Sequence, residues 1–216
     1  PSVSRVPAPR SSTTDAPSGF LDGLRFTGSF HMGDSPVHAA LAQLVRRLNE
    51  LGVPYAVVGA MALNAFGYRR ATVDIDVLLT AGGLARFKDA WLGRGYVERF
   101  AGSRGVRDTV AGVPIDFLLA GEYPGDGTPK AVRFPDPGRD AITVEGISLL
   151  PLERLVELKL ASGLSAPHRL RDLADVLELI RARDLDDALA ERLDPSVRGK
   201  YLELLRAARS AGPDGA

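Results

Sequence analysis

The spacing of apolar residues predicts a mixed α/β first half of the chain. Val37, Leu41, Leu44 and their neighbours recur at helical spacing after Ser35-Pro36, a pairing typical of a helix start, and Gly52 ends the run. Shorter apolar runs bounded by turn residues predict strands, and two further periodic stretches predict helices. The strands are expected at 53–58, 74–79, 106–110, 113–119 and 142–144, and the two further helices at 62–66 and 84–92.

The second half of the chain has helical periodicity only. Apolar residues recur every three or four positions over 152–162, 169–183 and 196–209. An α/β half followed by an all-α half predicts an α/β (α+β) fold, with a mixed sheet flanked by helices and a C-terminal helical subdomain. We expect the core to span 35–150 and the helical subdomain to span 151–210.

Composition places the chain among globular proteins and narrows its setting. Of 216 residues, 45% are hydrophobic, and 27 basic residues balance 27 acidic ones, so a nucleic-acid partner would need a local basic patch. Residues 1–34 are rich in Pro, Ser, Thr and Gly, which predicts a mostly disordered arm without the apolar stretch of a signal peptide. The absence of cysteine and of any membrane-spanning apolar run makes a cytoplasmic location the simplest expectation, with no membrane partner.

Three aspartates form the candidate chemistry of the chain. Asp74 and Asp76 are two positions apart in a predicted strand, so their side chains project to the same side. Asp116 alternates with Ile115 and Phe117 in another predicted strand. If the two strands pair, three carboxylates converge on one sheet edge, which would suit two Mg²⁺ ions. The competing interpretation is that an Asp-Ile-Asp triplet is an ordinary solvated strand face.

The surroundings of these aspartates resemble the nucleotidyltransferase superfamily signature. Val58-Gly59-Ala60 matches its hydrophobe-Gly-Gly/Ser opening, Asp74-Ile-Asp76 its acidic pair, and Ile115-Asp116-Phe117 its third acid. Within the superfamily, the run from Arg70 to Asp76 looks most like the AbiEii-like and MenT-like enzymes of abortive-infection and toxin–antitoxin systems. The resemblance covers roughly residues 40–183.

This resemblance implies an activity and a set of ligands. The chain would be a Mg²⁺-dependent enzyme that transfers NMP from an NTP to an acceptor hydroxyl and releases pyrophosphate. Asp74 and Asp76 would coordinate both metal ions, for which Mn²⁺ could substitute, and Asp116 would hold the acceptor-side ion. The acceptor would be tRNA or a protein, with a small molecule such as an aminoglycoside as a further option. A cognate antitoxin would be a partner.

The segment before the acidic strand offers phosphate ligands. Arg69 and Arg70 would lie at the mouth of a triphosphate site, where planar guanidinium groups suit phosphate, or they are an ordinary basic loop. Thr72 would bond phosphate or cap the turn. Backbone amides at Gly59 and Ala60 would cradle a phosphate, but Ala60 stands where relatives carry Ser or Gly and lacks a serine hydroxyl.

A lysine in the first C-terminal helix is the remaining candidate. Lys159 falls within the apolar arc of its helix, while Glu157 lies on the opposite face, and a lysine in a core requires a partner or a polar cleft. The pattern from Lys159 to Asp172 and Asp175 resembles a C-terminal motif of the same relatives, which would place Lys159 on the nucleotide phosphates with Asp172 nearby. The structural alternative is a Lys159–Asp172 pair that ties two helices together. Asp175 is assigned to solvation or packing.

Two other functional classes remain open on these data. The chain could be a binding module that keeps the fold without turnover, which the alanine at position 60 favours and three intact aspartates oppose. It could also be one half of a toxin–antitoxin pair that acts through its helical subdomain. His31, His38 and His168 have no ligand-like spacing, and the glycines at 82–83 and 102–105 fit turns better than a phosphate-binding loop.

Overall fold

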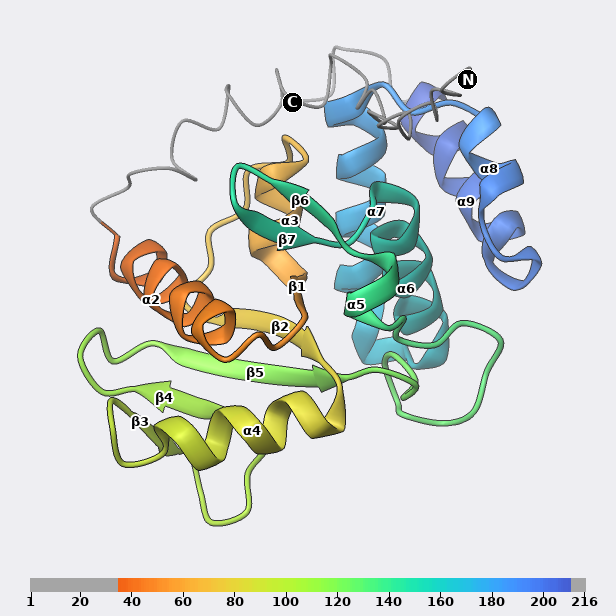
Figure 1. Cartoon of the computed structure of the whole chain (residues 1–216). Helices are drawn as coiled ribbons and strands as arrows, with labels where there is room; N and C mark the ends of the chain where they lie inside the picture. The colour runs from red at the N-terminus through yellow and green to blue at the C-terminus, as the bar shows by residue number, and fades with distance from the viewer. Residues whose placement is uncertain (1–34, 211–216) are drawn as a thin grey trace, which may run out of the picture.

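A computed structural model describes residues 35–210, which form a mixed sheet with helices packed around it (Figure 1). The sheet has seven strands in this part of the chain, in the order β3-β4-β5-β2-β1-β7-β6. The expected fold class, a mixed α/β sheet flanked by helices, is confirmed. The strands are β1 Tyr55–Val57, β2 Ile75–Leu79, β3 Tyr96–Glu98, β4 Val106–Asp108, β5 Pro114–Leu119, β6 Ile142–Val144 and β7 Ile147–Leu149.

The centre of the sheet is the parallel pair β2 and β5. They align residue by residue from Ile75 beside Ile115 to Leu79 beside Leu119. Ile75, Val77 and Phe117 are buried, so this face of the pair lies in the core and the alternate residues face the other way. The predicted pairing of the two acidic strands is therefore confirmed. Both strands also have antiparallel neighbours, β1 beside β2 and β4 beside β5.

Two of the helices, α2 (Pro36–Glu50) and α4 (Ala81–Trp91), contact each other as well as the core. The guanidinium of Arg47 lies 3.8 Å from the centre of the Trp91 ring, a cation–π contact between them. Helix α2 begins as the sequence predicts, because the Ser35 hydroxyl accepts a hydrogen bond from the Val37 amide. Within α4, the Phe87 ring packs edge-on against Tyr96 of β3 and Phe117 of β5.

The C-terminal helices pack together and beside the sheet (Figure 1). They are α6 Leu152–Ser165, α7 Leu170–Arg183, α8 Ala188–Arg192 and α9 Pro195–Ser210. The expectation that Glu157 faces solvent is wrong: its side chain is buried, and it accepts hydrogen bonds from Arg154 and from the Asp194 amide. Helices α7 and α9 both pack against α6, so some of its polar residues, such as Glu157, are not exposed to solvent.

Several of the short elements were not predicted from the sequence. They include strands β3 and β7 and helices α5 (Pro137–Asp140) and α8, which leave little room for a periodic pattern, although β6, also of three residues, was predicted. The predicted hairpin of β4 and β5 exists, but β4 ends at Asp108 and not at Val110. The buried Asp108 carboxylate accepts hydrogen bonds from the amides of Val110 and Ala111, which makes the loop longer than two residues.

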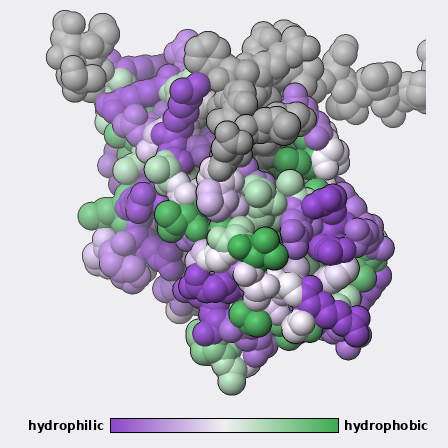
Figure 2. All heavy atoms as spheres, turned by 90° about the vertical axis from the view of Figure 1, so that its left-hand side faces the viewer, coloured by the Kyte–Doolittle hydropathy of each residue, from purple (hydrophilic) through white to green (hydrophobic). Residues whose placement is uncertain are grey.

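The outer surface is mainly hydrophilic in the view of Figure 2, with hydrophobic residues in small separate groups. Helix α3 (Gly59–Ala65) extends the predicted 62–66 helix at its start. None of the helices among the described residues is long and apolar enough to cross a bilayer. The N-terminal arm predicted for residues 1–34 lies outside the described residues.

Replacing Phe87 with alanine tests the packing of α4 on the sheet. Because the ring is fully buried between two other rings, we expect Phe87→Ala to lower the free energy of unfolding by about 3–5 kcal/mol. Denaturant unfolding measures the change. Val110→Ala, at a side chain that is 80% exposed, is the control and should change stability by no more than about 0.5 kcal/mol. Equal effects of the two variants would contradict this account of the core.

Candidate active site

The sheet brings two of the expected aspartates side by side. Asp76 of β2 lies opposite Asp116 of β5 in the parallel register, and both belong to the face that alternates with the buried core residues. Asp74 immediately precedes β2, two positions before Asp76. The three residues therefore meet on one surface of the central strand pair, as their spacing predicts.

The contact between Asp76 and Gly59 shows why a glycine is needed at the start of α3. Gly59 has a φ of +62°, which glycine adopts far more readily than other residues. A Cβ atom at this position would lie 2.0 Å from Asp76 Oδ2, an impossible contact. The glycine that the sequence assigned to a phosphate cradle has a structural role here: its missing side chain leaves space for the Asp76 carboxylate.

The environment of Asp76 disfavours its charged form. Burial, followed by the negative charges of Asp74 and Asp116, raises the pKa of the Asp76 carboxyl to about 6, while Lys159 and Arg70 act in the opposite direction. The site therefore combines a concentration of negative charge with two nearby cations that offset part of it. Asp76 is therefore the carboxylate on which the charges of the other two aspartates and of both cations act.

The two outer carboxylates have partners of their own. The Thr72 hydroxyl lies 2.6 Å from Asp74 Oδ1, and it accepts a hydrogen bond from the Asp74 amide at 3.4 Å. Thr72 therefore caps this turn, as one of the two predicted alternatives proposed. At Asp116, the Arg99 guanidinium donates to both carboxylate oxygens at 2.8 and 3.0 Å. Nothing in the sequence singled out Arg99, since its partner is 17 positions away and the loop between them has no motif.

The three carboxylates are chemically suited to bind a magnesium ion, but in the structure they are not arranged around one point. Within residues 35–210, no three histidine or acidic side chains are arranged to hold a metal ion. The candidate ligands are nevertheless carboxylates only, the donors that Mg²⁺ prefers, and their mutual repulsion shows in the raised pKa of Asp76. A divalent cation would relieve that repulsion once Asp116 is released from Arg99.

A cavity of about 270 Å³ opens beside Asp76. Of the three aspartates only Asp76 lines it, together with Gly59 and residues from α6, α7 and the segment after β5. The lining mixes polar and apolar side chains, as small-molecule sites do. Its polar members are Asp76, Glu122, Lys159, Ser162, Arg169 and Asp172, and its larger apolar members are Leu118, Tyr123, Phe134, Leu155 and Leu158.

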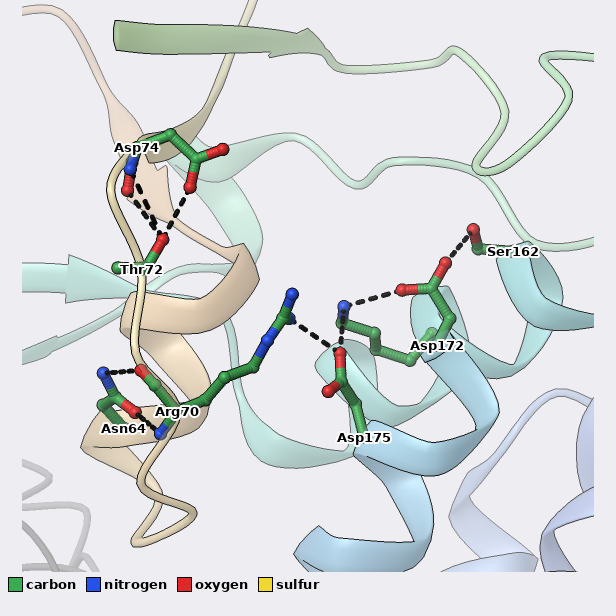
Figure 3. A network of polar contacts seen from close by, with 8 residues as sticks. Asn64, Arg70, Thr72, Asp74, Ser162, Asp172 and Asp175 are labelled. Carbon is green, nitrogen blue, oxygen red and sulfur yellow. Dashed lines mark hydrogen bonds and ion pairs between the residues drawn. The ribbon is translucent and has the colours of Figure 1, made fainter. Parts of the chain in front are cut away.

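Lys159 holds the polar wall of this cavity together. Its ammonium group lies 2.7 Å from Asp172 Oδ1 and 2.8 Å from Asp175 Oδ2, and the other oxygen of Asp172 accepts a hydrogen bond from Ser162. Figure 3 shows Asp172 and Asp175 on α7 facing this contact. The predicted Lys159–Asp172 pair is therefore present, and it ties α6 to α7. Both residues also line the cavity, so the pair belongs to the site as well as to the helix interface.

Asp175 has a packing role and not a solvation role, the two alternatives that the sequence left for it. It was expected on the polar side of its helix, but its side chain is only 2% exposed. One of its oxygens, Oδ2, accepts hydrogen bonds from both Lys159 and Arg70. The i, i+3 spacing with Asp172 on a helix was the signal, since it places both carboxylates on the same side as the lysine.

Arg70 reaches the site from the segment before β2 (Figure 3). Its main chain is fixed by Asn64, whose amide side chain bonds both the Arg70 amide and carbonyl, and its guanidinium lies 2.9 Å from Asp175. The Arg70 Nε atom is buried and has no hydrogen-bond partner within the described part of the chain. Arg69 is exposed and does have an interaction partner. The side chain of Ala60 is buried, and it contributes no hydroxyl.

Comparison with known proteins finds similarity of structure only. No protein-family model matches the chain, and no curated protein matches it significantly in sequence. A solved structure of ANT(2″)-Ia in complex with adenylyl-2″-tobramycin aligns over 80% of this chain and 96% of its own, with 12% identity and a TM-score of 0.48. JHP933 from Helicobacter pylori aligns over 78% of this chain and 89% of its own, with 19% identity and a TM-score of 0.41. At these values the functional argument depends on the geometry of the site.

Removing the Asp175 carboxylate tests whether it anchors the two cations. We expect Asp175→Ala to lower the free energy of unfolding by about 3 kcal/mol, because Lys159 and Arg70 would be left partly buried without their shared partner. Thermal or denaturant unfolding measures this loss. Glu178→Ala on the same helix removes an exposed ion pair with Arg181 and should cost less than about 1 kcal/mol. A loss no larger than that of Glu178→Ala would show that Asp175 is not an anchor.

The raised pKa of Asp76 predicts a pH-dependent stability. Because the pKa is about 6 in the folded chain against 3.8 as the reference value, the folded state holds the extra proton between these values, and stability falls as the pH rises through this window. In protein freed of metal with EDTA, Asp76→Asn should therefore stabilise the fold more at about pH 8 than at about pH 4, by on the order of 2 kcal/mol. Denaturant unfolding at both pH values measures the difference. An equal effect of the substitution at both would contradict the electrostatic account.

Proposed function

We propose that this protein is a nucleotidyltransferase that transfers NMP from an NTP to an acceptor hydroxyl and releases pyrophosphate. The observation that carries the proposal is the pairing of Asp76 with Asp116 in the centre of the sheet, beside a cavity lined by Asp76 and Lys159. Carboxylates on one side of a reacting phosphate and cations on the other are what in-line phosphoryl-group chemistry requires. The sequence resemblance to the nucleotidyltransferase superfamily agrees with this geometry, and the expected AbiEii-like or MenT-like placement within it is part of the proposal.

The cations supply the phosphate-binding half of the site. Lys159 lines the cavity, and both Lys159 and Arg70 lower the pKa of Asp76, so their charges act at the same place. Arg70 does not itself line the cavity, so it would act on the nucleotide through its charge. Asp175 and Asp172 would keep the two cations in position before the nucleotide binds. Arg69 and the backbone at Gly59 and Ala60 complete the proposed phosphate ligands.

The carboxylates supply the metal-binding half. Asp74, Asp76 and Asp116 would hold two Mg²⁺ ions, or Mn²⁺ in their place, and bound ions of this kind supply charge neutralisation and activation of the attacking hydroxyl. Asp76 would lose its proton as the cations bind, since their charge offsets the burial and the carboxylate repulsion that together raise its pKa to about 6. Asp116 would leave Arg99 and accept the proton of the acceptor hydroxyl. Most of the rate enhancement would come from positioning and electrostatics.

The acceptor and the biological setting follow from the resemblance alone. A tRNA or a protein side chain is the proposed acceptor, and the proposed setting is a toxin–antitoxin system with a cognate antitoxin as partner. An aminoglycoside acceptor is less well supported, because ANT(2″)-Ia, whose structure contains adenylyl-2″-tobramycin, shares only 12% identity with this chain.

A second candidate function is a non-catalytic nucleotide- or partner-binding module. The engagement of Asp74 by Thr72 and of Asp116 by Arg99 favours it, as does the alanine at position 60. The two candidates differ in whether the three carboxylates are needed for turnover. A binding module would keep its nucleotide or partner when the acidic pair is removed, whereas the enzyme would lose transfer.

The decisive experiment is incubation with each α-³²P-labelled NTP, Mg²⁺ and either total tRNA or cell lysate. We expect label on a macromolecular acceptor with the wild-type chain and none with Asp74→Ala/Asp76→Ala, because the metal-binding pair is lost. Lys159→Ala should lower the rate by at least about 100-fold, since a positioned cation on the phosphates is removed. Val110→Ala, in the β4–β5 loop at a side chain that is 80% exposed, is the matched control and should transfer label as the wild type does.

If folded wild-type protein that binds Mg²⁺ transfers no label from any NTP, the enzyme proposal is wrong and the binding module takes its place. Nucleotide binding followed with the same labelled NTPs then separates the two forms of that module, since a nucleotide-binding protein retains the label without transferring it.

A further inference from the structure

The position of the cavity relative to Asp116 indicates from which side an acceptor would approach the site. Asp116 and Leu118 are two positions apart on β5 and face the same side, but only Leu118 lines the cavity. The Asp116 carboxylate is 40% exposed, beyond the cavity lining. If the cavity takes the nucleotide, as the proposed function requires, then whatever is modified must approach over Asp116.

The surface next to Asp116 is the loop between β3 and β4, residues 99–105. The loop meets Asp116 at both its ends. Arg99 donates to the carboxylate, and a Cβ atom on Gly105 would lie 2.6 Å from Asp116 Oδ1, so the backbone there is in direct contact with it. Both ends of this seven-residue loop are therefore fixed at Asp116.

The loop is held in shape by a set of internal contacts. The Glu98 carboxylate accepts a hydrogen bond from the Gly102 amide at 2.8 Å and pairs with Lys88 of α4 at 2.7 Å. Lys88 also donates to the Ser103 carbonyl, and the Ser103 amide donates to the Phe100 carbonyl at 2.9 Å. The charge of Glu98 is thereby satisfied from two sides, and it does not add a repulsive charge to the loop surface.

This anchored loop presents an aromatic ring among arginines. Phe100 is 70% exposed, although it is a large hydrophobic residue in a loop that is fixed at several points. Between positions 99 and 107 the sequence has three arginines, Arg99, Arg104 and Arg107, and no acidic residue, in a chain whose total charge is balanced. Arg104 and Arg99 are more than 40% exposed while paired to carboxylates. Val73, next to Asp74, is a second exposed apolar side chain beside the acids, 77% exposed.

We infer that residues 99–105 are the acceptor-binding surface of the site, and that they bind a single-stranded nucleic acid that ends in a free hydroxyl. An exposed ring in a loop that also carries arginines is the combination that stacks a base and holds the flanking phosphates. The release of Asp116 by Arg99 fits the same event, because a strand phosphate offers the guanidinium another anion. The inference rests on the proposed function for the place of the acceptor, but strand binding itself needs no NTP.

The test is binding of a 3′-hydroxyl RNA strand of about 12 nucleotides, labelled at its 5′ end, to the full chain without nucleotide, followed by fluorescence anisotropy. We expect Phe100→Ala to weaken binding about tenfold, Phe100→Trp to keep it, and Val110→Ala to leave it unchanged. Val110 is the matched control because it is an equally exposed hydrophobic residue on the neighbouring β4–β5 loop. Arg104→Ala should reduce the salt dependence of binding by the share of one phosphate contact.

Absence of strand binding by the wild type, or equal binding by Phe100→Ala, would overturn the inference. A DNA strand of the same sequence forms a second arm, and binding of either strand with the same dependence on Phe100 supports the proposed surface. Failure of the proposed function is seen separately: the strand would bind through Phe100, but no labelled NTP would be transferred to it in the presence of Mg²⁺. Conversely, transfer to a protein in the absence of strand binding would keep the enzyme and remove this surface.

Discussion

The repulsion between neighbouring carboxylates on β2 and β5 is the constraint on which the rest of the site depends. Parallel pairing sets Asp76 directly beside Asp116, and Asp74 adds a third negative charge two positions away. Burial makes this arrangement costlier, which is why the pKa of Asp76 rises to about 6. A fold that served stability alone would gain by placing a neutral residue at position 76.

The surrounding structure compensates for this charge in layers. Arg99 pairs with Asp116, while the charges of Lys159 and Arg70 lower the pKa of Asp76. These last two cations are in turn held by Asp175, so that acidic and basic groups alternate from the centre of the sheet to helix α7. The alternation links the segment before β2 to α6 and α7, and a change of charge at Asp76 acts on all three.

Such a network is suited to exchanging partners during a reaction. Metal ions would replace Arg99 at Asp116, and a triphosphate would share Lys159 and Arg70 with their aspartates. Each exchange keeps the number of opposite charges in contact nearly constant, so that ligands can enter a partly buried site at a small electrostatic cost. Arg104 of the proposed strand-binding loop pairs with Glu122, which lines the proposed nucleotide cavity, so the two surfaces adjoin.

The sequence by itself determined the parts of this protein that depend on local patterns. Helix α2 and its serine cap, the strand that carries Asp76, and the shared face of Asp74 and Asp76 all follow from periodicity over a few residues. The Lys159–Asp172 pair could also be predicted from the sequence, because a lysine in an apolar arc needs a partner. Strands β3 and β7 were not predicted, since three residues leave little room for an alternating pattern, although β6 of the same length was found.

Only the tertiary structure decided which distant groups meet. Asp175 is buried and not solvated because Lys159 and Arg70 cover the polar side of α7, and Arg70 is 105 positions away in sequence. The clamp of Arg99 on Asp116 and the cavity formed with Tyr123 and Phe134 depend on strand order and on loop packing, and no local pattern encodes either. The physical reason is the same in each case: burial and charge pairing are properties of the space around a residue, whereas periodicity describes only its neighbours along the chain.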